Sequence, residues 1–170
     1  MAEARVVEPS APAAGLFQPI PLVAIALLVL NDHVLKRAMP GLLTGKLSDF
    51  AGLAFFPLVL EALAEVVRHL LGRDARPSAR RLALCTFLTG LVFAAIKTVA
   101  WAGDVYSVAL GALQWPFAAA LSAARGRPWP ELHRVAFVRD ATDLVALPAL
   151  GLALLAGRAR RARAPAGPGD

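Results

Sequence analysis

The sequence contains few of the residues on which catalysis, metal binding or covalent crosslinking most often depend. Its 170 residues include one cysteine, three histidines and one tyrosine. Because one cysteine cannot form an intrachain disulfide, Cys85 is predicted to be a free thiol in an apolar segment. The histidines, His33, His69 and His133, lie in no motif typical of a metal site or a hydrolase triad. We therefore predict no cofactor and no metal ion.

Charged residues are scarce as well. They make up 18% of the chain, whereas hydrophobic residues make up 58%, more than a soluble domain of this length requires. The net charge of +6 comes mostly from arginines beside apolar segments, as positive-inside anchoring produces. We expect no nucleic-acid partner. The composition predicts an all-α fold, a polytopic transmembrane helix bundle with four to five spanning segments, whose partner is the lipid bilayer of an inner membrane.

Composition divides the chain into three parts. Residues 1–15, rich in alanine, proline and glutamate, predict a disordered leader. Residues 16–157 predict a single transmembrane helical domain, and residues 158–170, which hold four arginines, predict a disordered basic tail. The leader lacks the basic start of a secretory signal peptide, so the first apolar segment, Leu16–Leu35, is expected to be a retained span.

The second span has two possible frames. A helix over residues 42–60 would place Lys46 and Asp49 inside the membrane, whereas a helix over residues 50–71 would begin after them. Ser48 and Asp49 are good N-cap residues, and Asp49 would complement the helix dipole. We therefore favour the later frame.

Two further sets of charges in the predicted spans are expected to reach the surface. In the later frame Glu61 and Glu65 lie one turn apart and are followed by Arg68 and His69, which predicts an intrahelical charge ladder leading to water. Lys97, near the end of the third span, is expected to snorkel to the membrane interface.

Three polar clusters lie where apolar segments end, and they are the candidate functional site because ionisable groups at membrane depth are costly. The candidates are Asn31, Asp32, His33 and Lys36 in the first cluster, Lys46, Ser48 and Asp49 in the second, and Arg139, Asp140, Thr142 and Asp143 in the third.

The residue types suggest what each cluster can do. Asp32 and Lys36 are one helical turn apart and can pair, and Arg139 and Asp143 have the same spacing. Thr142 can cap a helix. The segment around Lys46 lacks the spaced glycines of a P-loop, but a lysine at a helix N-terminus could hold an anionic lipid headgroup.

The fourth apolar segment decides whether these clusters can share a membrane face. Val105–Ala123 contains Pro116, so it either crosses with a kink or enters and leaves on one side as a re-entrant element. The last segment, Leu144–Gly157, is too short to cross unless it includes Val135–Asp143. If Val105–Ala123 crosses, the chain has five crossings, and the first and third clusters lie on opposite faces of the membrane. If it is re-entrant, the chain has four crossings, and the two clusters lie on the same face. Counting lysines and arginines favours a cytoplasmic N-terminus in both cases.

Three stretches of this sequence, Asn31–Lys36, Pro40–Leu53 and Asp140–Leu144, carry the motifs NDHxLK, LTGKLSDFAGL and DxTDL. In these motifs the chain resembles a family of small uncharacterised bacterial multi-pass membrane proteins. The resemblance covers about 30 residues and implies a helical protein of the bacterial inner membrane.

The chain is also similar to the VanZ-like membrane proteins, which place a short charged motif before an early span and an Arg followed by Asp before a late one. Lys46–Asp49 and Arg139–Asp143 occupy those places. The order of Lys and Asp is reversed here, and the acidic-plus-glutamine motif late in the third span is missing, so no catalytic role is transferred.

Two hypotheses for the function follow, and the residues do not decide whether the protein is an enzyme. In the first, the charged clusters form a site at one membrane face that binds an anionic or lipid-linked headgroup. In the second, the protein is a non-enzymatic structural component, or a small ion or proton transport component, in which charged pairs lock helices together or line a path.

Overall fold

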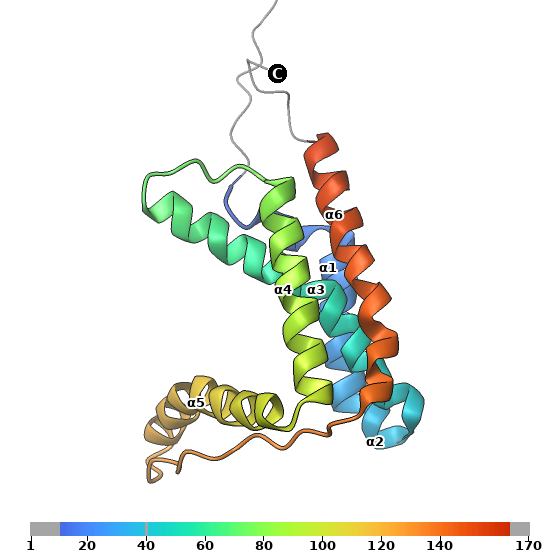
Figure 1. The fold of residues 1–170 in the computed structure, drawn as a ribbon. Helices are drawn as coiled ribbons and strands as arrows, with labels where there is room; N and C mark the ends of the chain where they lie inside the picture. The colour runs from blue at the N-terminus through green and yellow to red at the C-terminus, as the bar shows by residue number, and fades with distance from the viewer. Residues whose placement is uncertain (1–10, 40, 164–170) are drawn as a thin grey trace, which may run out of the picture. The chain divides into compact units, whose positions relative to one another are not determined.

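The structure, a computed structural model, describes residues 11–39 and 41–163 as an all-helical chain without a strand in those ranges (Figure 1). Its elements are η1 (Ala14–Phe17), α1 (Pro19–Leu30), η2 (Asn31–Leu35), α2 (Lys36–Ala38), α3 (Leu42–Leu70), α4 (Ala79–Thr98), α5 (Ala100–Ala124), η3 (Ala141–Ala149) and α6 (Leu150–Arg163). Five helical segments are long and apolar enough to cross a membrane: Pro19–Ala38, Leu42–Leu70, Ala79–Thr98, Ala100–Ala124 and Ala141–Arg163. The predicted all-α polytopic transmembrane bundle is confirmed.

The packing is that of a membrane protein, with small residues inside and large apolar residues outside. Among the described residues, ten of the thirteen buried apolar side chains other than proline are alanine. Large side chains such as Leu43, Phe56, Leu63 and Phe87 are more than half exposed on the helix surfaces. Alanine lets transmembrane helices approach closely, and the outer leucines and phenylalanines match the acyl chains of lipid.

The chain divides into two compact units, and each is described by itself. Unit 1 comprises Met1–Gly90 and Val145–Asp170, and unit 2 comprises Leu91–Leu144. The predicted single domain over residues 16–157 therefore consists of two such units.

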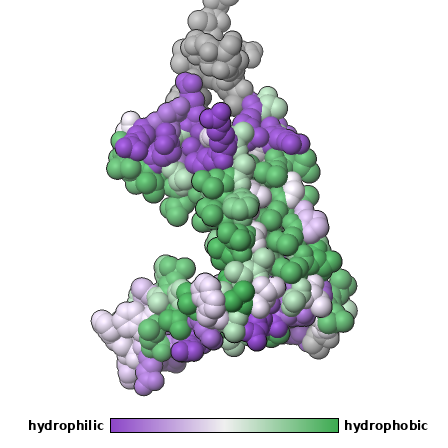
Figure 2. All heavy atoms as spheres, viewed as in Figure 1, coloured by the Kyte–Doolittle hydropathy of each residue, from purple (hydrophilic) through white to green (hydrophobic). Residues whose placement is uncertain are grey.

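The helices of unit 1 meet at two opposite ends. At one, Asn31 near the end of the first span donates a hydrogen bond to the carbonyl oxygen of Thr44 at the start of α3. At the other, Glu65 near the end of α3 binds Arg81 at the start of α4 and Arg160 near the end of α6. We call them the site end and the arginine end. Figure 2 shows hydrophilic residues gathered at the arginine end, at the top of the view, and hydrophobic surface along the helices.

Helices α4 and α6 run antiparallel in unit 1. A methyl group added at Gly157 would overlap the Leu82 side chain, and one added at Gly90 would lie 2.8 Å from Cδ1 of Leu150. The chain therefore runs toward the site end as it leaves unit 1 after Gly90. It enters unit 1 again, at Val145, from that same end.

Unit 2 holds the end of α4, α5, an extended return segment (residues 127–140) that packs back along α5, and the start of η3. Ser107 Oγ donates to the Val135 carbonyl oxygen at 2.7 Å, and Val135 N–H donates to the Ser107 carbonyl oxygen at 3.1 Å. Trp115 Nε1 donates to the Pro130 carbonyl oxygen at 2.8 Å, so the return segment is antiparallel to the helix.

The second span differs from both predicted frames, because α3 is one helix of 29 residues that covers the two of them. The prediction that Ser48 and Asp49 cap this helix is wrong: both lie in its second turn. Thr44 provides the cap instead, since its Oγ1 accepts a hydrogen bond from Gly41 N–H at 3.1 Å. No proline lies between Leu42 and Phe50, and the helix starts directly after Gly41.

The ends of the transmembrane region also differ from the prediction. The first span runs from Pro19 to Ala38 rather than from Leu16 to Leu35, and part of the predicted leader forms η1. The last span continues through Arg158 to Arg163, so the predicted disordered tail is wrong for those residues. Residues 1–10 of the predicted leader and 164–170 of the predicted tail lie outside the described residues.

Candidate functional site

The first polar cluster lies on a π-helical turn at the site end. Lys36 N–H donates to the Asn31 carbonyl oxygen, five residues earlier, and residues Asn31–Leu35 form the turn. Single π-helical turns within α-helices occur frequently at functional sites. The turn carries Asn31, Asp32 and His33, three of the residues that the sequence singled out.

Asn31 fastens the first span to α3. Its side chain is completely buried, and Nδ2 donates to the Thr44 carbonyl oxygen at 2.6 Å and to Ser48 Oγ at 2.8 Å. Its Oδ1 is buried and has no hydrogen-bond partner among the described residues. A buried acceptor without a partner costs about 1–3 kcal/mol. The amide therefore fixes the register of the two helices at some cost in stability.

Ser48 extends this contact to a carboxylate and an ammonium group. Its Oγ donates to Asp32 Oδ1 at 2.6 Å, and Lys36 Nζ lies 2.7 Å from the same oxygen. The predicted pairing of Asp32 with Lys36 is confirmed. Both side chains are about two-fifths exposed, so this pair faces the surroundings and His33 beside it is exposed as well. The result is a continuous polar network, Asn31–Ser48–Asp32–Lys36.

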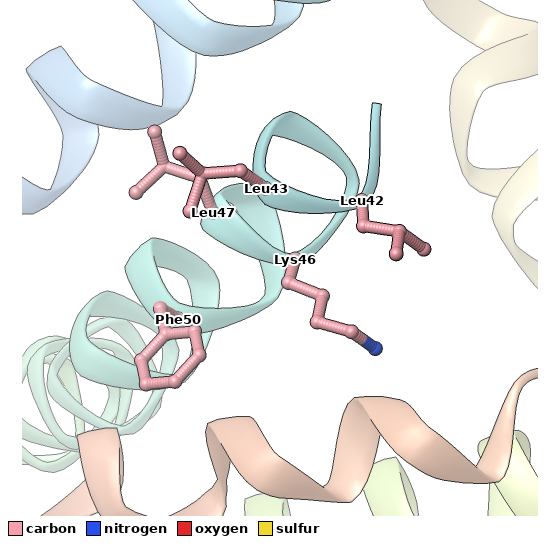
Figure 3. Close-up of a pocket in the computed structure, with 5 residues that line it drawn as sticks. All are labelled: Leu42, Leu43, Lys46, Leu47 and Phe50. Carbon is pink, nitrogen blue, oxygen red and sulfur yellow. The ribbon is translucent and has the colours of Figure 1, made fainter. Parts of the chain in front are cut away.

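Lys46 lies on a different side of α3 from this network. Ser48 faces the first span, and a residue two positions away in a helix points elsewhere. Lys46 lines a shallow hollow of about 360 Å³ whose other lining residues are Leu42, Leu43, Leu47 and Phe50. Figure 3 shows these five side chains. The second predicted cluster is thus divided: Ser48 joins the first cluster, whereas Lys46 lines an apolar hollow. Asp49 is half-buried.

The third cluster, in unit 2, caps η3 and holds an ion pair. Asp140 Oδ1 accepts hydrogen bonds from Thr142 N–H and Thr142 Oγ1, both at 2.8 Å, so Asp140 rather than Thr142 is the capping residue. Asp143 is buried, and its Oδ2 lies 2.6 Å from Lys97 Nζ. The predicted pairing of Asp143 with Arg139 is wrong, because the cation paired with Asp143 is Lys97, whereas Arg139 is exposed. Lys97 is the second-last residue of α4, so its pairing with Asp143 lies at the end of that span, and its snorkelling to the interface stays a prediction.

A buried cluster of four charges at the arginine end escaped the sequence prediction. Glu65 is completely buried and accepts from Arg160 Nη1 at 2.6 Å, Arg160 Nη2 at 3.0 Å and Arg81 Nη2 at 3.3 Å. Arg81 also lies 3.8 Å from the buried Glu61. The predicted ladder from Glu61 and Glu65 to Arg68 and His69 is wrong, because these carboxylates bind arginines of other helices.

The described residues contain no group of three or more histidine, cysteine, aspartate or glutamate side chains that could hold a metal ion. Comparison of the chain with protein-family models, with curated proteins and with solved structures found no match. The resemblance to the small bacterial multi-pass family therefore stays a prediction.

Proposed function

We propose that the protein is a multi-pass protein of the bacterial inner membrane that binds the phosphate-bearing headgroup of an anionic or lipid-linked amphiphile at the site end of unit 1. In this proposal Lys46 binds the phosphate and the hollow beside it receives the adjoining part of the chain. The fixed network around Asn31 and Asp32 holds the start of α3 in place.

The observation that carries the proposal is the environment of Lys46. Its side chain lines a hollow whose other lining residues are all apolar, and two of them, Leu42 and Leu43, are about 80% exposed. A cation beside an open apolar surface matches an amphiphile, which offers a negative group next to hydrocarbon. An ammonium group has three N–H donors, so Lys46 can bind a headgroup oxygen in addition to a protein partner.

Lipid retention tests the proposal. The protein would be purified in detergent with phosphatidylglycerol, with a polyprenyl monophosphate or with phosphatidylcholine, and bound lipid counted by native mass spectrometry. We expect retention of one or both phosphate-bearing anionic lipids, and the two arms distinguish a phospholipid from a lipid-linked carrier. Lys46→Gln should lower retention at least tenfold, which corresponds to about 1.4 kcal/mol, whereas Lys46→Arg should preserve most of it.

Arg37→Gln is the matched control, because Arg37 is an exposed cation close to Lys46 in the sequence and is not among the residues that line the hollow. A surface charge that merely attracts anionic lipid contributes about 1 kcal/mol or less. Equal losses for Lys46→Gln and Arg37→Gln would show general attraction by surface charge and would contradict the proposal. Equal retention of phosphatidylcholine would contradict it too.

A second candidate function is a structural or ion-transport component, and the paired charges favour it. Glu65 with Arg160 in unit 1 and Asp143 with Lys97 in unit 2 join elements distant in sequence, as charges that lock helices together would. This candidate predicts that Lys46→Gln leaves lipid retention unchanged. It also predicts that Asp32→Asn lowers the yield of folded protein or changes ion flux into proteoliposomes.

A further inference from the structure

Helix α5 has two unlike faces. The face that meets the return segment holds Gly103, Ser107 and Gly111; a methyl group added at Gly103 would overlap Phe137, and one at Gly111 would overlap the His133 carbonyl oxygen. Away from that contact, Val105, Leu113 and Phe117 are 59%, 67% and 75% exposed. The helix is therefore covered by chain on one side and presents a broad apolar surface on the other.

The return segment is unsuited to the hydrocarbon core of a bilayer. It lies outside the helices of the described chain, and its exposed residues include Arg127, Glu131, His133 and Arg134. An irregular backbone with exposed charges is not found facing lipid at membrane depth, because its polar groups would lose their water. The segment therefore belongs in the headgroup region or in water. The return segment contacts α5 from Trp115 to Gly103, so the helix must lie at nearly the same membrane depth as that segment.

The connections of unit 2 lead to the same conclusion. In unit 1, α4 and α6 are antiparallel, so the chain leaves toward the site end and returns from it. Residues 99–140 must then cross the membrane an even number of times or not at all. Helix α5 is long and apolar enough to cross, but a crossing would require the charged return segment to cross back.

We propose that α5 does not cross the membrane but lies along the lipid surface on the side of the membrane where α4 ends, with its apolar face among the acyl chains and the return segment toward water. Trp101, 69% exposed at the start of the helix, and Trp129, 70% exposed in the return segment, suit this interfacial position. The protein then crosses the membrane four times. The apolar face of α5 contacts the lipid leaflet on the side of the membrane where α4 ends.

Depth measurement by spin labelling tests this arrangement. In a Cys85→Ser background, Val105→Cys, Leu113→Cys and Phe117→Cys would be labelled in lipid vesicles and their depths determined by power saturation. We expect similar depths, about 5–10 Å below the headgroups, as for interfacial helices. A helix that crosses would separate the first and last labels by about 18 Å, since the rise is about 1.5 Å per residue. That result would overturn the proposal.

Labels at Leu84→Cys and Leu91→Cys on α4, both exposed, give the matched control, and their depths should differ by about 10 Å. A second measurement compares sides: Arg127→Cys should react with a membrane-impermeant thiol reagent from the same side as Ala38→Cys. Reaction from the side of Arg76→Cys would mean five crossings and would overturn the proposal. Neither measurement depends on headgroup binding at Lys46, so the two proposals can fail separately.

Discussion

Replacing Arg160 with methionine should destabilise unit 1 strongly, because it leaves the Glu65 carboxylate buried without its bidentate partner. Breaking a buried ion pair from one side typically costs about 3–5 kcal/mol. In the four-charge cluster the two glutamates balance Arg81 and Arg160. Arg160→Met leaves one uncompensated negative charge there, and Glu65→Leu leaves one uncompensated positive charge. We expect each substitution to lower the free energy of unfolding by about 3 kcal/mol or more.

The double variant Glu65→Leu/Arg160→Met restores neutrality and should recover most of this loss. Replacement of a whole buried ion pair by apolar residues is often neutral, so the expected coupling energy is about 3 kcal/mol or more. Unfolding titrations in mixed micelles of the four proteins would measure it, with the exposed Arg158→Gln as the control for arginine loss on the same helix. If the double variant loses as much unfolding free energy as the two single variants together, Glu65 and Arg160 do not stabilise each other, and this explanation of the cluster is wrong.

Two smaller predictions concern packing and the third cluster. Gly157→Ala should destabilise by about 1–3 kcal/mol because the new methyl group meets Leu82, whereas Gly151→Ala, with open space around it, should be neutral or stabilising in the same unfolding titration. Asp143→Asn should lower the thermal unfolding temperature because Asp143 binds a lysine in unit 2, whereas the exposed Arg139→Gln should change it little; equal effects would contradict the pairing.

The sequence was sufficient for the helices and for the local pair. Apolar segments of spanning length predict membrane helices because lipid requires every backbone group to bond internally. Asp32 and Lys36 pair as predicted because both lie in one continuous helical segment, where a spacing of four residues brings side chains together.

The sequence pattern could not predict contacts between segments that are far apart in the chain. Arg160 looked like part of a solvated tail, but α6 continues past Arg158 and brings it to Glu65, 95 residues away in the chain. A signal was present: Glu61 and Glu65 lie in a stretch, residues 50–67, that is otherwise apolar, and carboxylates at membrane depth require cations as partners. Ser48 similarly looked like a helix cap, and its place between Asn31 and Asp32 depends on how the first span packs on α3.

Photocrosslinking of a lipid carrying a reactive group in its acyl chain tests headgroup binding most directly. With a photoactivatable phosphatidylglycerol, or the corresponding polyprenyl phosphate, in membranes, crosslinked residues would be identified by peptide mass spectrometry. We expect crosslinks concentrated on Leu42, Leu43, Leu47 and Phe50 and lost in Lys46→Gln. Crosslinks spread evenly over other exposed leucines, such as Leu63 and Leu91, with no dependence on Lys46, would contradict it.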